Sequence, residues 1–371
     1  METRNLELLR SKLEGAGLDA VVAVNKKSVV YLSDAPTAWS DWQQRRADGP
    51  SICFVVWPAK GDPVLIVGEL EREVTAECAW IPRLECYAEY AETPYEKLGK
   101  VLDDLGLRGK RVGIEKRAVG AAYWEALTKA HRDTTFIEAG PLLDSVRAQK
   151  TEAEISIFRQ ACSMLDRVYL SVFSRARPGT TELELHTAML ETADSMGMSD
   201  TFGNLLSGDR AMVVHRSPMR RAIKPGDIIR TDYISFWRGR AANLSRVFVV
   251  GEPSQEQKTI YRSLREVELE VYEHIKPGLR AFDLWNFYIR RVETRGFKVD
   301  LPLLGHNIGT EAHEEPMIAQ ADTGALESRM VICVEPFFGK QYQIQDQLLI
   351  TSNGIELLSN GFPTEEMFVV E

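Results

Sequence analysis

The sequence has little cysteine, no long apolar run and no excess of positive charge. Its five cysteines are odd in number and lack any C-x-x-C spacing, which argues against a disulfide framework and a thiolate zinc site. No segment reaches the roughly 20 apolar residues that a membrane-spanning helix needs. The formal net charge of -9 gives no overall attraction to nucleic acid. We therefore expect a soluble, cytoplasmic protein that acts on a small-molecule substrate, not on nucleic acid or a membrane.

The chain changes in texture near residue 147. Its 371 residues exceed one typical hydrophobic core, which predicts two domains. Before residue 147, short β-type runs such as "DAVVAV" and "PVLIVG" alternate with helical stretches, as in a small α/β layer. After it come longer helices, beginning with "KTEAEISIFRQACSMLDRVYLSVFSRA". The sequence thus predicts an α+β protein with an N-terminal α/β domain over 1–147 and a second domain over 148–371.

The second half contains a weak internal repeat. Pro178 to Gly197 and Pro277 to Gly296 match without a gap, and each segment follows a long helix, opens with a basic residue before Pro-Gly and ends on a glycine. A chance pairing of two helix-turn-helix segments is the alternative. If the repeat is real, two related half-domains lie about a pseudo-two-fold axis, with a site at the seam.

Acidic and amide residues interrupt the apolar strands of this half. The stretch "PGDIIRTDYISFWRGRAANLSRVFVVGE" predicts two strands around a tight turn, with Asp232 on the first and Asn243 on the second. Glu335 ends the apolar run "RMVICV", and Gln345 and Asp346 precede another. An edge-strand acid that faces water explains any one of these. Buried acids in three strands indicate a site, because a buried charge is costly unless it is paired or ligated.

At these residues the sequence resembles the pita-bread superfamily of methionine aminopeptidase, prolidase, Xaa-Pro aminopeptidase and creatinase. The segments "GLDAVVAVNKKSVVYLSD" and "LLDSVRAQKTEAEISIFRQA" resemble the N-terminal creatinase-type domain and its junction to the catalytic domain. The resemblance covers nearly the whole chain. It implies a small N-terminal creatinase-type domain followed by a pseudo-two-fold pita-bread catalytic domain, and a homodimer.

The resemblance also implies roles for five residues. Asp232, His306 in "GHNIG" and Glu335 in "VEP" stand where the metallopeptidases of this superfamily place metal ligands. His215 in "VVHRSP" and His313 in "AHEEP" stand where they place catalytic histidines. Five motifs in sequence order form a specific signal, which a lone G-H-x-x-G would not.

Two positions depart from the metallopeptidase pattern. Asn243 and Gln345 stand where the resemblance implies two acids that bridge a pair of metal ions. Replacing both acids removes two negative charges, and a close pair of divalent ions depends on such charge to offset its own repulsion. Creatinase, which the C-terminal "GFPTEEMFVVE" also resembles, implies that this fold can hydrolyse a C–N bond without metal. The stretch from Asn243 to Val247 departs from creatinase's Ala-Leu-Glu-Arg-Thr, so creatine itself is not expected as the substrate.

These departures favour a metal-independent, creatinase-like hydrolase of a C–N bond in a small amide, amidine or dipeptide-like substrate, with no cofactor. The predicted catalytic residues are His215, as the main proton carrier, with His306, His313 and Glu335; the predicted substrate-binding residues are Asp232, Asn243, Arg246 and Gln345. One alternative is an Xaa-Pro dipeptidase or aminopeptidase with a single manganese, cobalt or zinc ion on Asp232, His306 and Glu335. The other is a non-catalytic relative that only binds a ligand.

Overall fold

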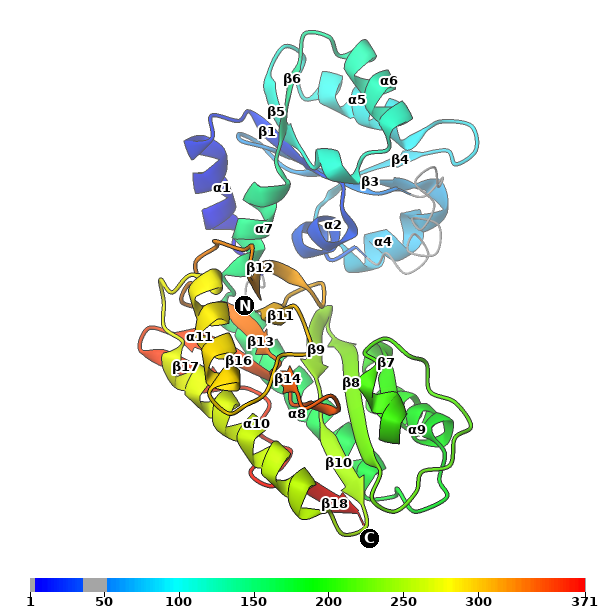
Figure 1. Cartoon of the computed structure of the whole chain (residues 1–371). Coiled ribbons are helices and arrows are strands. Elements are labelled where there is room, and N and C mark those ends of the chain that lie inside the picture. Colours follow the sequence, from blue (N-terminus) through cyan, green and yellow to red (C-terminus); the bar gives the residue numbers. More distant parts are fainter. Residues whose placement is uncertain (1–3, 36–51, 371) are drawn as a thin grey trace. The chain divides into compact units, whose positions relative to one another are not determined.

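The computed structural model describes residues 4–35 and 52–370. The chain divides into two compact units, one spanning Arg4–Arg147 and one that begins at Ala148 (Figure 1). The mixed α+β composition expected from the sequence is confirmed in both. No helix within the described residues is long and apolar enough to span a bilayer. All five cysteines lie in the described part, and each is a free thiol.

The N-terminal unit is an α/β layer built on one sheet. Within the described residues its strands follow the order β4-β3-β2-β1-β5-β6. The central strands β1, β2 and β3 are buried along their whole length, because helices cover the sheet with two apolar clusters. The strands are β1 (Ala20–Ala23), β2 (Phe54–Pro58), β3 (Val64–Gly68), β4 (Arg83–Tyr87), β5 (Arg111–Ile114) and β6 (Thr135–Glu138). The described helices are α1 (Leu6–Gly15), α2 (Lys26–Ser33), α4 (Arg72–Cys78), α5 (Pro94–Asp104), α6 (Ala121–Ala130) and α7 (Gly140–Ala148), with 3-10 turns η1 (Glu69–Glu71) and η2 (Lys116–Ala118).

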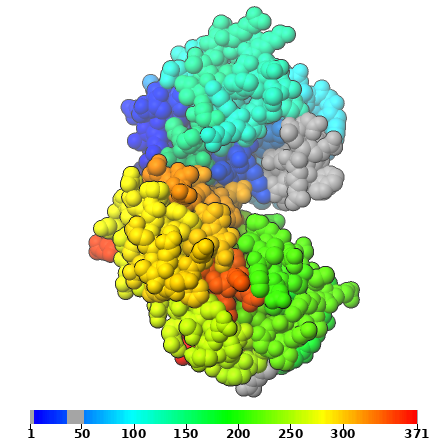
Figure 2. Space-filling view, viewed as in Figure 1, coloured from blue at the N-terminus to red at the C-terminus, as the bar shows by residue number. Residues whose placement is uncertain are grey.

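The larger unit consists of two halves with the same order of elements. Each half has a long helix, a shorter helix and then antiparallel strands, and the C-terminal strand β18 joins the first sheet in parallel with β10 (Figure 1). The first half contains α8 (Glu152–Phe173), α9 (Glu182–Ser195), β7 (Ser199–Ser207), η3 (Gly208–Met212), β8 (Ile228–Trp237), β9 (Arg240–Leu244) and β10 (Val247–Val250). The second half contains α10 (Gln255–His274), α11 (Ala281–Glu293), β11 (Leu303–Asn307), β12 (Glu314–Ala319), β13 (Val331–Val334), β14 (Phe337–Phe338), β15 (Tyr342–Gln343), β16 (Asp346–Thr351), β17 (Gly354–Leu357) and β18 (Phe368–Val370). The first half is green and the second runs from yellow to red on the surface in Figure 2.

The internal repeat predicted from the sequence is confirmed in this unit. Gly179 and Gly278 take left-handed backbone angles, with φ of 93° and 85°, in the turns before α9 and α11. Gly197 and Gly296 do the same after these helices, with φ of 82° and 81°. Glycine adopts this conformation without the steric cost that a side chain adds. Each half therefore has two glycine turns, and they reverse the chain at matching points of the two halves.

The larger unit has two sheets and two apolar cores, and each core contains residues from both sheets. The first sheet follows the order β18-β10-β8-β7, with β9 also paired to β8, and the second follows β12-β11-β13-β16-β17. Helix α8 packs on β8 and β9, while α10 and α11 pack together and α11 covers β11 and β12. Two separate clusters of buried apolar residues fill these layers. The polar side chains of the predicted site lie on strands from both sheets.

Candidate functional site

The β8–β9 hairpin holds Asp232 beside Asn243, as the sequence predicted. Its turn uses Arg238 and Gly239 with φ of 48° and 70°, the conformation of a tight two-residue hairpin turn. Ile234 pairs with Asn243 across the ladder. Asn243 is buried, Asp232 is half-buried, and Asn243 Nδ2 donates a hydrogen bond of 2.9 Å to Asp232 Oδ1. One oxygen of the carboxylate is therefore already engaged by the amide.

Gln345 joins the same chain of hydrogen bonds from the second sheet. Ser245 and Gln345 form an isolated β-bridge between the two halves. Ser245 Oγ donates to Gln345 Oε1 at 2.9 Å, and Gln345 Nε2 donates to Asn243 Oδ1 at 2.8 Å. We call the chain Ser245–Gln345–Asn243–Asp232 the amide relay. Both amide oxygens accept hydrogen bonds within the relay. Asp232 therefore faces the N–H group of Asn243 and not a second carboxylate.

His306 lies on β11 and is fully buried. Its Nδ1 is 3.1 Å from the carbonyl oxygen of Asn307, which can only accept, so Nδ1 carries the ring proton. Nε2 then presents a lone pair, has no hydrogen-bond partner within the described residues, and lies 3.8 Å from Glu335 Oε1. Burial, and next the neighbouring His313, lower the pKa of His306 to about 3. The ring is a neutral imidazole with a free nitrogen that faces a carboxylate.

Glu335 follows directly on β13 and is also buried. Its backbone N–H donates to the Leu304 carbonyl at 2.7 Å, and its Oε2 accepts from Gln343 Nε2 at 3.0 Å. Burial, and next the negative charge of Asp232, raise the pKa of Glu335 to about 8. Two carboxylates therefore repel each other across the site, and a cation between them would relieve that repulsion.

The two remaining histidines predicted for catalysis lie at the edge of this cluster. The His313 ring packs on His306 with centroids 4.0 Å apart. The pKa of His313 is lowered first by desolvation and also by His215, whereas Asp232 raises it. His215 lies in the loop after η3 and is exposed. The structure thus brings His306, His313 and Glu335 together, and His215 lies near enough to influence His313. His215 and His313 are both exposed, whereas His306 and Glu335 are buried.

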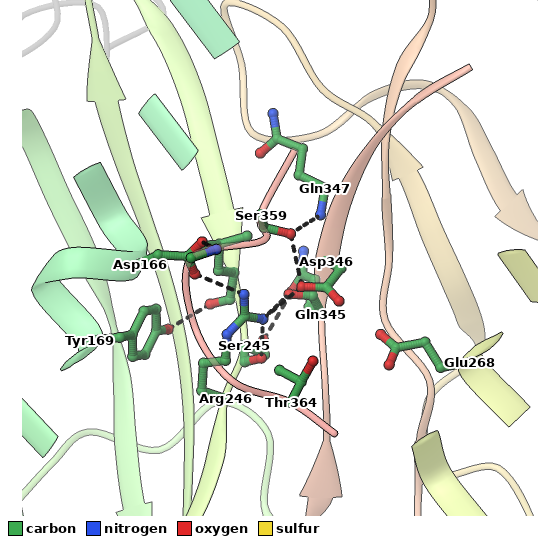
Figure 3. A network of polar contacts seen from close by, with 12 residues as sticks. Asp166, Tyr169, Ser245, Arg246, Glu268, Gln345, Asp346, Gln347, Ser359 and Thr364 are labelled. Carbon is green, nitrogen blue, oxygen red and sulfur yellow. Dashed lines mark hydrogen bonds and ion pairs between the residues drawn. The ribbon is translucent and has the colours of Figure 1, made fainter. Parts of the chain in front are cut away.

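Arg246 is not oriented as a substrate-binding residue. Its guanidinium lies in a buried ion-pair network with Asp166 at 2.9 Å and Asp346 at 3.0 Å (Figure 3). It also donates to the backbone carbonyls of Ser245 and Gln345, at 3.1 Å and 2.7 Å. Arg246 therefore stabilises the backbone of two relay residues, Ser245 and Gln345, through contacts within the core. The predicted contact between Arg246 and substrate has no support in this geometry.

Two site residues were missed in the sequence. Arg230 lies two positions before Asp232 on β8, on the same face of the strand, and Gln343 links it to Glu335. The available signal was a basic residue in the apolar run "IIRTD". This signal is weak, because a lone arginine in a strand usually faces solvent.

The donors present fit one divalent ion better than two. Among residues 4–35 and 52–370, no three histidine, cysteine, aspartate or glutamate side chains stand in a ready-made metal-binding arrangement. The unpartnered Nε2 of buried His306 beside Glu335 is nevertheless a nitrogen–carboxylate pair of the kind that binds such ions. Asp232 supplies a third donor of the right type. Bridging a second ion would need carboxylates where the relay has amides that are bonded to each other.

Comparison with known proteins is consistent with this frame. The model of metallopeptidase family M24 matches residues 156–368, and the creatinase/prolidase N-terminal domain matches residues 5–149. The chain is 28% identical over 355 residues to an Xaa-Pro dipeptidase of Pyrococcus horikoshii, covering 92% of this chain and 93% of that protein. Among solved structures, the prolidase from the same organism is 25% identical with a TM-score of 0.79 and covers 96% of this chain and 98% of its own. An Xaa-Pro dipeptidase from Bacillus anthracis is 24% identical with a TM-score of 0.83 and covers 99% of both chains.

These findings correct the main functional prediction. The expectation of a metal-independent, creatinase-like hydrolase with no cofactor is wrong, because the matching family is one of metallopeptidases and the similar proteins are Xaa-Pro dipeptidases. The charge argument from Asn243 and Gln345 counts against a second bridged ion only. The two amides do not affect the other three donors, Asp232, His306 and Glu335, which the sequence retains.

Both matched domains lie in the predicted order and together extend over most of the chain, and the catalytic match alone covers more than half of it. The chain belongs to metallopeptidase family M24 and is a hydrolase of peptide C–N bonds with the pita-bread fold.

Proposed function

We propose that the protein is an Xaa-Pro dipeptidase or aminopeptidase that works with a single divalent ion held by Asp232, His306 and Glu335. The single observation that carries this proposal is the buried, unpartnered Nε2 of His306 at 3.8 Å from Glu335 Oε1. A buried nitrogen without a partner is costly, and an ion at this place would satisfy it. The similarity to Xaa-Pro dipeptidases supports the choice of substrate class.

The protonation of His306 agrees with its proposed role as a ligand. Neutral imidazole is the form that binds a metal ion, and burial keeps His306 neutral. The Asn307 carbonyl holds the proton on Nδ1 and so leaves Nε2 as the donor atom. Asn243 fixes one oxygen of Asp232 and Gln343 fixes one oxygen of Glu335, so each carboxylate presents its other oxygen. A bound ion would polarise the scissile carbonyl and lower the pKa of a water.

The remaining residues of the site transfer protons, stabilise developing negative charge and orient Asp232. His215 is exposed at the edge of the cluster, where it can pass a proton between solvent and the leaving nitrogen. His313, packed on His306 and coupled to Asp232, is placed to donate a hydrogen bond to the carbonyl oxygen as negative charge develops there. The amide relay keeps Asp232 in one orientation during this step.

The experiment is a hydrolysis assay on chelator-treated protein. Ala-Pro and Met-Pro are the test substrates, with Ala-Ala and creatine as controls, each with and without added manganese, cobalt or zinc. We expect hydrolysis of the proline dipeptides only, and only after one of the ions is returned. Activity that survives chelation, or a lack of preference for proline after the ion is returned, contradicts the proposal.

A pair of variants separates the ion site from general damage. His306→Ala removes the proposed nitrogen ligand and should abolish ion-dependent hydrolysis. His274→Ala, on helix α10 with its ring stacked on Phe287, is the matched control and should keep it. Equal activity in both variants would remove His306 from the proposed ligand set.

A further inference from the structure

Arg230 is a buried arginine without an ion pair. It is fully buried on β8, and within the described residues no carboxylate lies within ion-pair distance of its guanidinium. Its guanidinium carbon lies 5.2 Å from the centre of the Phe337 ring. An isolated buried charge is costly unless neighbouring dipoles or more distant charges compensate it. The position of this arginine therefore needs an explanation.

Its hydrogen bonds join three segments of the site. Nε donates to the carbonyl of Ala211 at 2.9 Å, and Nη2 donates to those of Val213 and Val214 at 3.1 Å each. These carbonyls belong to η3 and the segment that ends immediately before His215. The planar fork of arginine suits such a set of contacts, whereas lysine could not make all of them. Arg230 thus fixes the backbone that carries His215.

The fourth contact leads to Glu335. Arg230 Nη1 donates to Gln343 Oε1 at 2.9 Å, and Gln343 Nε2 donates to Glu335 Oε2 at 3.0 Å. One carboxamide therefore separates the guanidinium from this carboxylate. Asp232 lies on the same face of β8. Burial lowers the pKa of Arg230, while the charges of Asp232 and Glu335 raise it, which is consistent with electrostatic coupling across the site.

We propose that Arg230 is a positioning residue that orients Glu335 and the segment before His215, and that its fixed positive charge restricts the site to weak binding of one divalent ion. This inference rests on the proposed function, since it concerns the same ion site. A positive charge beside Asp232 and Glu335 repels a divalent cation and so weakens its binding. The positive charge of the arginine also disfavours a second divalent ion at this site.

The test is calorimetric titration of manganese into chelator-treated protein, paired with turnover of Ala-Pro. Arg230→Met removes both charge and fork, Arg230→Lys keeps the charge, and Arg159→Met, at an exposed arginine on α8 paired with Glu356, is the control. We expect Arg230→Met to bind manganese at least about tenfold more tightly than wild type. Arg230→Lys and the control should stay within about threefold. Turnover should fall about a hundredfold in both Arg230 variants, because the segment that carries His215 loses its placement.

The outcomes separate this inference from the proposed function. Wild type that binds no manganese would overturn the proposed function and this inference with it. Wild type that binds manganese while Arg230→Met binds it no more tightly overturns the inference alone. If circular dichroism shows that Arg230→Met is unfolded, Arg230→Lys and Gln343→Leu are used to test the positioning role of Arg230. Reduced turnover with near-normal manganese affinity in these two variants supports the proposal, and unchanged turnover overturns it.

Discussion

Burial sets the protonation of the innermost side chains at the site. The ring of His306 stays neutral because the protein interior disfavours its charged form, and its free Nε2 is thereby ready to bind an ion. The pKa of Glu335 shifts in the opposite direction, upward, because burial and Asp232 favour its protonated form. These effects depend on which groups surround each residue in space. A histidine and a glutamate 29 positions apart in "GHNIG" and "VEP" carry no such information in the sequence.

At the residue scale, His215→Ala should remove most turnover without affecting folding. His215 is exposed at the edge of the site, where it can carry a proton to solvent. Loss of a positioned proton carrier typically costs about a hundred- to ten-thousand-fold in rate. Steady-state kinetics on Ala-Pro, with circular dichroism to check folding, measures the effect. An unchanged kcat would assign the proton transfer to another group.

A second residue-scale prediction concerns Glu268, which lies near the Arg246 network (Figure 3) and is linked to its Asp346 through the Tyr272 hydroxyl. Burial, and next Asp346, raise its pKa to about 7 from 4.5, although Arg265 and Tyr272 act against this shift. Between about pH 4.5 and 7 the folded protein therefore binds the Glu268 proton and the unfolded chain does not. The stability that this proton provides is complete below pH 4.5 and is lost as the pH rises toward 7.

Urea unfolding at pH 5 and pH 7.5 tests this dependence. Wild type should lose on the order of 3 kcal/mol from this group between the two pH values, and Glu268→Gln should lose correspondingly less. Asp346, Arg265, Arg246 and Tyr272 remain in both proteins, so the difference between them isolates Glu268. Parallel pH profiles for the two proteins would show that Glu268 is ionised in the folded state throughout.

At the scale of elements, the sequence predicted the strands and turns well and the side-chain partnerships poorly. The β8–β9 hairpin follows from alternating apolar residues around Arg-Gly-Arg, and the repeated helices follow from Pro-Gly and terminal glycines at matching positions. Those signals are local. The amide relay and the Arg246 network join residues about 100 positions apart, and they depend on rotamers and registers between two sheets that no local pattern encodes.

The relay between the two sheets gives an element-scale prediction. The double change Asn243→Asp with Gln345→Glu places two additional acids at the end of β9 and before β16, where their repulsion should destabilise the fold without metal. Manganese should stabilise wild type, and it should stabilise the double variant by more. A ligand that binds only the folded state adds about 2.7 kcal/mol at a hundredfold excess over its Kd. Thermal unfolding with and without millimolar manganese measures both, and equal shifts would contradict the relay's assigned effect.

At the scale of the whole molecule, we keep 1–147 and 148–371 as the proposed domains and a homodimer as the proposed assembly. The resemblance to the pita-bread enzymes is the basis for the dimer. Multi-angle light scattering at micromolar concentration should give twice the mass of one chain. A single-chain mass across the concentration range would end this proposal, with no consequence for the ion site.

We propose above that one divalent ion binds at Asp232, His306 and Glu335. This proposal is tested by equilibrium dialysis against excess manganese, with the manganese bound per chain measured by plasma mass spectrometry for wild type, His306→Ala and the His274→Ala control. We expect one manganese per chain in wild type and in His274→Ala, and close to none in His306→Ala. Two ions per chain in wild type, or an equal content in His306→Ala, would contradict it.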